Sequence, residues 1–180
     1  MANVAGKPAL VAQQDGHGHT KNATAIATAS DGRGMVTVGM DRTLQHWFSA
    51  RGPARSEMAG HTGPVYASSF SPDDKLLATA GGDRTVRLWN LETGEPAGTL
   101  EGHTHQVTGV SFNPQVKQLA STSLDGTLRV WPLEGDAEVR VFRDGVQGGL
   151  LAVDITPNGN GISVVGRDRR WRLLARDTLK

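Results

Sequence analysis

Residues 60–90 read GHTGPVYASSFSPDDKLLATAGGDRTVRLWN, and residues 102–132 read GHTHQVTGVSFNPQVKQLASTSLDGTLRVWP. The two stretches align without a gap at a spacing of 42 residues, each with Gly-His first, an Asp in the second half and a Trp next to last. A weaker copy of the same pattern begins at Gly18. Several markers that return in phase indicate that the chain is built from copies of one supersecondary unit.

Each copy is predicted to hold four short β-strands. In the second repeat, runs rich in apolar and β-branched residues cover 65–70, 76–80 and 85–89, and a fourth run covers 97–100. Turn chemistry separates the runs, as SPDD at 71–74 and GGDR at 81–84. No segment has a helical apolar period over eleven or more residues, so the sequence predicts an all-β chain.

The ordered Gly-His, Phe-Ser-Pro-like turn, Asp turn and Val-Arg-Leu-Trp strand resemble the WD-repeat family, and the resemblance covers almost the whole chain. It implies a β-propeller domain over 1–180, with four four-stranded blades per chain. The expected blades span 18–57, 60–99, 102–141 and 144–180, and residues 8–13 are expected to complete the last blade as its fourth strand.

The resemblance also implies a hydrogen-bonded set of four side chains in each intact blade, drawn from a His, a Ser or Thr, an Asp and a Trp. The matching residues are His19, Thr37, Asp41 and Trp47 in the first repeat, His61, Thr79, Asp83 and Trp89 in the second, and His103, Ser121, Asp125 and Trp131 in the third. A buried imidazole needs partners at both nitrogens and a buried indole N–H needs an acceptor. Loss of one member therefore leaves the others buried and unsatisfied.

The fourth repeat departs from this pattern. Asp168 keeps the Asp position, but Val164 falls where a Ser or Thr is expected, and Leu174 where the Trp is expected. Trp171 comes three residues too early. The blade is therefore predicted to form from apolar strands near 150–155, 161–165 and 171–174 without the polar set, as a degenerate terminal repeat does.

Four repeats leave the closure of the ring open. Propellers have about four to eight blades, so three arrangements are considered. Two chains could form one eight-bladed ring as a homodimer, the chain could be part of a longer propeller, or four blades could close alone. The two-chain ring is preferred because each unpaired strand edge is an aggregation template, and residues 8–13 could complete the partner's last blade.

The amino-acid composition argues against several classes of function. A net charge of +1 argues against a general nucleic-acid or membrane-surface binder. The absence of Cys excludes disulfides and zinc–thiolate sites, and the repeated histidines, one per blade, are expected to lie too far apart to share a metal. No signal peptide or membrane span is visible. We therefore expect a cytoplasmic protein with no cofactor.

The resemblance implies a non-catalytic scaffold that binds a peptide or protein domain on one face of the propeller. The expected contact residues lie before the turn Asp of each repeat, with one on a first strand: Met40, Tyr66, Gly82, Leu124 and Arg167. A propeller enzyme and a fragment of a larger multidomain regulatory protein remain as alternatives. An enzyme would need titratable groups that converge on one face. His46, next to Trp47 on a strand, is expected to be exposed.

Overall fold

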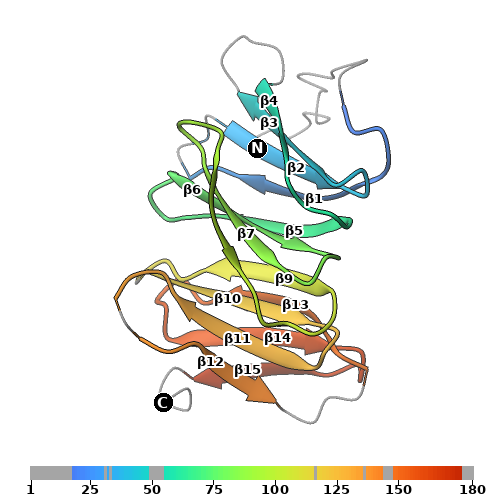
Figure 1. Ribbon diagram of the computed structural model, residues 1–180. Helices are drawn as coiled ribbons and strands as arrows, with labels where there is room; N and C mark the ends of the chain where they lie inside the picture. The colour runs from blue at the N-terminus through green and yellow to red at the C-terminus, as the bar shows by residue number, and fades with distance from the viewer. Residues whose placement is uncertain are drawn as a thin grey trace, which may run out of the picture.

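A computed structural model describes residues 18–30, 32, 34–48, 55–115, 117–135, 137–143 and 148–175 (Figure 1). They form four antiparallel sheets, one per repeat. The strands of the first two blades are β1 (Ala23–Thr28), β2 (Gly34–Gly39), β3 (Thr43–Phe48) and β4 (Arg55–Ala59), then β5 (Val65–Phe70), β6 (Leu76–Gly81), β7 (Val86–Asn90) and β8 (Pro96–Leu100). Those of the last two are β9 (Val107–Phe112), β10 (Gln118–Ser123), β11 (Thr127–Pro132) and β12 (Arg140–Arg143), then β13 (Leu150–Ile155), β14 (Gly161–Gly166) and β15 (Trp171–Ala175).

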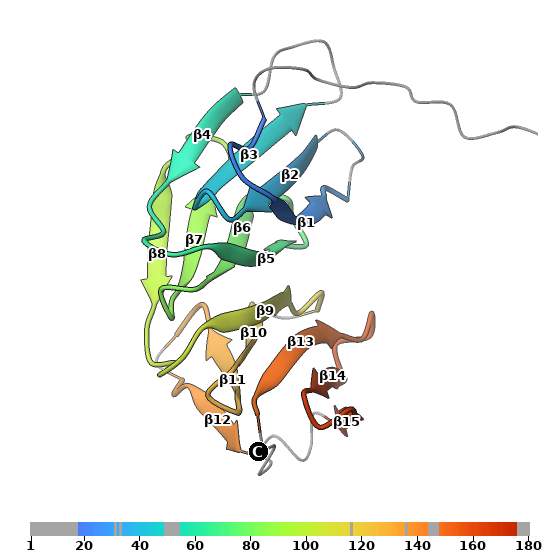
Figure 2. The ribbon, with the colours of Figure 1, turned by 90° about the vertical axis from the view of Figure 1, so that its right-hand side faces the viewer.

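Strands follow one another in chain order within each sheet. The sheets lie side by side along an arc, with β4, β8 and β12 on its outer side (Figure 2). Neighbouring blades meet through their first strands, because β1 contacts β5, β5 contacts β9, and β9 contacts β13. The first and fourth blades lie at opposite ends of the arc (Figures 1 and 2). The described residues therefore form an open arc of four propeller blades, not a closed four-bladed ring.

The arc has two faces that the turns define. The upper face carries the turns between second and third strands, at 39–43, 81–85, 123–127 and 166–170. The lower face carries the turns between first and second strands, at 71–75 and 156–160 among others. In each upper turn the third residue past the strand end has a positive φ, and Arg84 (φ 72°) stands where the third blade has Gly126 (φ 80°).

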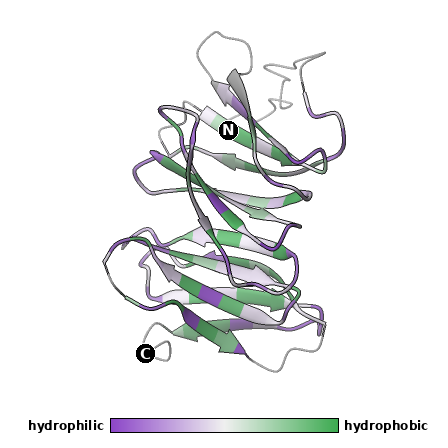
Figure 3. Cartoon of the chain, in the orientation of Figure 1, coloured by the Kyte–Doolittle hydropathy of each residue, from purple (hydrophilic) through white to green (hydrophobic). Residues whose placement is uncertain are grey.

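The hydrophobic core lies between blades rather than inside any one of them. Three clusters join the first blade to the second, the second to the third, and the third to the fourth. At the middle seam, Val86 and Leu88 of β7 meet Val107 and Val110 of β9. Figure 3 shows hydrophobic segments along the strands of all four sheets. Each fully buried Val or Leu contributes roughly 1.5–3 kcal/mol, so each blade is stabilised mainly by its neighbours.

The expectation that His46 is exposed is wrong. His46 is 7% exposed, although it does point away from Trp47 along the strand. The reason is that both faces of a blade are covered. His46 occupies the position of Leu88 and Val130 in the next two blades, and those side chains pack against the following blade.

The fourth sheet has three strands among the described residues, in the order β13-β14-β15. Residues 8–13, predicted to supply its fourth strand, lie outside the described residues. The three strands themselves fall where the sequence predicts them. In the other blades the fourth strands end at Ala59, Leu100 and Arg143, one or two residues beyond the expected blade ends.

The two ends of the arc expose apolar side chains that are buried elsewhere in the molecule. On β15, Trp171 is 77% exposed and Leu173 is 57% exposed, whereas Leu128, in the position of Trp171 one blade earlier, is 1% exposed. On the first blade, Ile26 is 60% exposed, while its counterpart Val110 is buried. These two apolar surfaces are the ones that an adjoining blade would cover.

Candidate functional site

The second blade shows how one intact repeat is held together. His61 Nδ1 lies 2.8 Å from Asp83 Oδ2, and His61 Nε2 lies 2.8 Å from Thr79 Oγ1. The indole Nε1–H of Trp89 donates to the same Thr79 Oγ1 at 2.9 Å. The structure thus brings together the four side chains named from the sequence. They link the residue before the first strand to β6, to the turn after β6 and to β7.

The donor and acceptor roles in this set follow from the chemistry of its ends. An ionised Asp83 only accepts, so His61 Nδ1–H is the donor there. The other nitrogen of a neutral imidazole is then an acceptor, and the Thr79 hydroxyl donates to it while accepting from Trp89. Every polar atom at these three contacts is satisfied.

The first and third blades repeat the arrangement. His19 Nδ1 lies 3.0 Å from Asp41 Oδ1, and the Nε2 atom of His19 and the Nε1 atom of Trp47 each lie 2.9 Å from Thr37 Oγ1. In the third blade, the corresponding distances join His103 to Asp125 (2.9 Å), His103 to Ser121 (2.8 Å) and Trp131 to Ser121 (2.8 Å). A fifth member was missed: Thr43, Thr85 and Thr127 each donate a hydroxyl to the turn Asp of their blade. The repeated Asp-x-Thr spacing was a signal for it.

Close packing explains why a glycine precedes the histidine in the second and third repeats. A Cβ on Gly60 would lie 2.9 Å from Trp89 Cη2, and a Cβ on Gly102 would lie 2.5 Å from Arg129 Nη1. Arg129 also donates through Nη2 to the Gly102 carbonyl at 2.7 Å and stacks over the ring of Trp131. The third-strand side chains therefore pass directly over the glycine, and a larger residue would displace them.

Burial and hydrogen bonding set the pKa values of the aspartates in these sets. Burial alone raises the pKa of Asp83, but hydrogen bonds from His61, Thr85 and the backbone of Thr62 outweigh it and hold the pKa well below its usual range. The same balance lowers the pKa of Asp41 to about 2. Burial lowers the pKa of His103, and the attraction of Asp125 only partly opposes it. The charges of the carboxylates are thus fixed near neutral pH.

We expect the free energy of unfolding to fall on acidification in two stages. The folded pKa of His103 lies below its ordinary value of 6.5, so the unfolded chain binds the proton first and stability falls as the pH drops below that value. Asp41 has a folded pKa of about 2 against an ordinary 3.8, so about 2 kcal/mol is lost between those values. Urea unfolding from about pH 8 to pH 2 tests both stages. A free energy of unfolding that stays constant across that range would contradict them.

The fourth blade lacks the polar set, as the sequence predicts. Val164 is buried at the Ser/Thr position, and Ile162 pairs with Leu174, where Leu77 pairs with Trp89 in the second blade. Asp168 accepts from Arg172 Nη2 at 2.5 Å instead of from a histidine. The pKa of Asp168 is lowered by this hydrogen bond. Apolar packing and one partly exposed ion pair therefore stand where the other blades have the polar set.

The upper face repeats one backbone contact at each turn. The residue before the turn Asp donates its N–H to a carbonyl that precedes the first strand of the same blade. The pairs are Met40 to Asn22 (2.9 Å), Gly82 to Pro64 (2.7 Å), Leu124 to Gln106 (3.0 Å) and Arg167 to Gly149 (3.0 Å). Four of the predicted contact residues therefore stand at equivalent points around this face.

The predicted contact residues do not form one cluster. A Cβ on Gly82 would lie 3.3 Å from Tyr66 Cε2, so the tyrosine ring lies against that turn. Leu124 is close to Gly149, whose carbonyl binds the backbone of Arg167, so these two turns adjoin across the third and fourth blades. Met40 is exposed on the first blade. The five residues are therefore distributed over all four blades, and only some of them adjoin one another.

The turn aspartates of the upper face are engaged within their own blades. In the parts of the chain that the structure describes, no three His, Cys, Asp or Glu side chains are placed to hold a metal ion. No helix in those parts is long and apolar enough to cross a membrane. In each of the first three blades, the histidine of the Gly-His pair is hydrogen-bonded to the turn aspartate.

The comparison with known families agrees with this architecture. The model of the WD domain, G-beta repeat, matches residues 10–47, 52–90 and 94–132. These segments cover more than half of the chain, which therefore belongs to the WD-repeat family. Propellers of this family typically mediate protein interactions and are generally non-catalytic. The three matches end at or next to Trp47, Trp89 and Trp131, and the blade without a polar set lies beyond them. No match to a curated protein was found.

Proposed function

We propose that this chain is a non-catalytic interaction scaffold that binds a peptide or a protein domain on its upper face. The observation that carries the proposal is the repeated backbone contact that presents Met40, Leu124 and Arg167 at equivalent points of successive turns. Met, Arg and aromatic side chains are enriched at protein interfaces. The enzyme alternative lacks support, because the polar side chains that could do chemistry are engaged in the blade sets.

A triple substitution tests this binding face. Peptides selected from a random library on the immobilised protein are titrated against the Met40→Ala, Leu124→Ala, Arg167→Ala variant. We expect the affinity to fall by roughly 30-fold or more, because a few anchor residues carry most of the energy of an interface.

The matched control carries Val139→Ala, Val141→Ala and Arg143→Ala, two exposed apolar residues and one arginine at the outer edge of the third blade. It is expected to bind as the parent does. If the upper-face variant keeps the parent affinity, or if both variants lose it equally, the assignment of this face is wrong.

We further propose that two chains close one eight-bladed ring. Trp171 and Leu173 form the apolar surface of the fourth blade. They occupy the positions that Leu128 and Val130 have in the third blade, where these two side chains are buried at the seam with the fourth blade. Ile26 and Met35 of the first blade correspond to Val110 and Leu119, which fill the other side of the middle seam. The two open surfaces are thus the two halves of a blade seam. A two-fold ring would join each to its counterpart on the second chain.

Hydroxyl contacts also join neighbouring blades within the chain. Thr24 donates its hydroxyl to the Val65 carbonyl of the next blade, and Thr108 does the same to the Leu150 carbonyl at 2.8 Å. Residues 8–13, proposed as the missing strand of the partner's fourth blade, would pair the edge of β15. In the alternative, further blades of a longer chain would cover both open surfaces. The molar mass in solution distinguishes this arrangement from the two-chain ring.

A further inference from the structure

A hollow on the lower face lies between the second and third blades. It has a volume of ≈ 300 Å³ and is bounded by the turn after β5, the turn after β9 and the residues that follow β11. It is on the opposite face from the contacts proposed above, and it lies at the middle seam rather than at either end of the arc. Its availability is therefore the same in one chain or in a two-chain ring.

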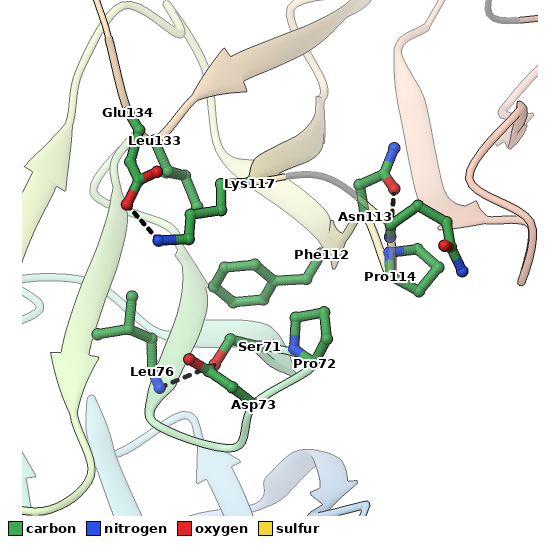
Figure 4. Close-up of a pocket in the computed structure, with 11 residues that line it drawn as sticks. Ser71, Pro72, Asp73, Leu76, Phe112, Asn113, Pro114, Lys117, Leu133 and Glu134 are labelled. Carbon is green, nitrogen blue, oxygen red and sulfur yellow. Dashed lines mark hydrogen bonds and ion pairs between the residues drawn. The ribbon is translucent and has the colours of Figure 1, made fainter.

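The floor of the hollow is apolar. Phe112 lies at its centre, with Leu76 and Leu133 to one side and Pro72 and Pro114 to the other (Figure 4). A volume of this size accommodates an aliphatic or aromatic side chain, and pockets that bind such groups are mainly lined by apolar residues.

Hydrogen bonds hold the walls of the hollow in place. Ser71 Oγ donates to Asp73 Oδ1 at 2.6 Å and accepts from the Leu76 N–H at 2.9 Å. On the other wall, Asn113 Nδ2 donates to the Gly159 carbonyl, and Asn113 Oδ1 accepts from the Gln115 N–H. The backbone N–H of Phe112 donates to Ser69 Oγ across the seam. The hollow is therefore largely formed before a ligand arrives, which lowers the entropic cost of binding.

Two carboxylates and one ammonium group are among the side chains that line the hollow. Asp73 and Glu134 line it, and Lys117, the basic residue among the lining side chains, is paired with Glu134. The hydrogen bond from Ser71 lowers the pKa of Asp73, so the carboxylate is ionised. The Ser71 hydroxyl and the backbone N–H of Lys75 both donate to Oδ1 of Asp73 and hold this carboxylate at the rim of the hollow.

A second hollow adjoins the first. It has a volume of ≈ 320 Å³, lies between the first and second blades, and shares with the first hollow a border made of Ser71, Pro72, Phe112 and Pro114. Asp74 lines it and accepts from the backbone and side chain of Ser30. The two hollows together make a groove that runs across the lower face, which suits an extended chain better than a compact ligand.

We propose that this groove binds an extended peptide segment in which a leucine-sized apolar residue has Lys or Arg neighbours. The apolar side chain enters the hollow over Phe112, and a flanking cation lies beside Asp73. The ligand chemistry follows from the apolar floor and from the excess of acidic over basic side chains around it.

Amide chemical shifts of the ¹⁵N-labelled full chain provide the test, with three blocked tripeptides as probes. Acetyl-Lys-Leu-Lys-amide is expected to move the amide signals of Asp73, Leu76 and Phe112 in a saturable way. Acetyl-Lys-Ala-Lys-amide should bind about tenfold more weakly, because the buried apolar area is smaller. Acetyl-Glu-Leu-Glu-amide should bind at least about fivefold more weakly, because attraction becomes repulsion.

Two variants separate the contributions. Asp73→Asn should reduce the preference for the basic over the acidic peptide, and Leu133→Asp should weaken binding of the leucine peptide, while Val141→Asp on the outer strand should change neither. The proposal is overturned if the three peptides bind equally, or if the shifted signals belong to the upper face. Equal binding of the three peptides would count against this groove alone and would leave the proposal for the upper face unaffected.

Discussion

Replacing Asp83 by Ala is expected to lower the free energy of unfolding by about 2–4 kcal/mol. The substitution removes the acceptor of His61 Nδ1 and of the Thr62 and Thr85 donors, all within 3.2 Å in the folded chain. The side chain of His61 is 0% exposed, so water replaces its lost partner poorly. Trp89→Ala is expected to cost a similar amount or more, since it also leaves a cavity at the first seam.

Urea unfolding followed by circular dichroism measures both effects. Glu92→Ala is the matched acid control, because Glu92 is exposed on a turn of the same blade, and its effect should stay within about 0.5 kcal/mol. Leu174→Ala, at the Trp position of the fourth blade, should cost through packing alone. The importance of the polar set would be disproved by equal, small shifts of the midpoint for Asp83→Ala and Glu92→Ala.

Replacing Trp171 by Asp is expected to split the proposed ring into single chains. The side chain lies on the open surface of the fourth blade, where the ring would bury it, and a carboxylate buried at an apolar seam without a partner is strongly unfavourable. In the isolated chain the same residue is 77% exposed, so the substitution should leave the fold of each chain intact. Size-exclusion chromatography at several concentrations, with circular dichroism of the same samples, measures the two effects separately.

Val141→Asp is the control for this substitution, because Val141 is also exposed and apolar but lies on the outer strand β12. It should leave the elution volume unchanged. If Trp171→Asp elutes like the parent protein at every concentration, the fourth-blade surface does not form the seam.

The repeat spacing was enough to predict the strands and four of the five members of each polar set. The reason is that Gly-His, the turn Asp and the Trp each have a local task that fixes their position in the blade, as Gly60 beneath Trp89 illustrates. His46 shows where local reasoning fails. Its strand alternation was interpreted as exposure, but both faces of a blade are covered, and the packing of one blade on the next cannot be read from a single strand.

The hydrogen bonds between blades could not be predicted from the sequence either. Thr108 and Ser111 look like ordinary polar strand residues, yet Thr108 binds the Leu150 carbonyl and Ser111 contacts Asp154 of the next blade. The lower groove depends on three turns that come together only when the second and third blades pack. The number of blades in the closed ring stays a prediction, since it depends on what covers Ile26 and Trp171.

The two-chain ring is tested most directly by light scattering of the full chain and of a version that lacks residues 1–14. A mass of about 38 kDa, twice the 19.1 kDa of one chain, is expected for the full chain. The shortened version should dissociate or aggregate, because the last blade of each partner would lose its fourth strand. A full chain of 19.1 kDa that keeps its β-sheet signal after the deletion would contradict both the ring and the proposed role of residues 8–13.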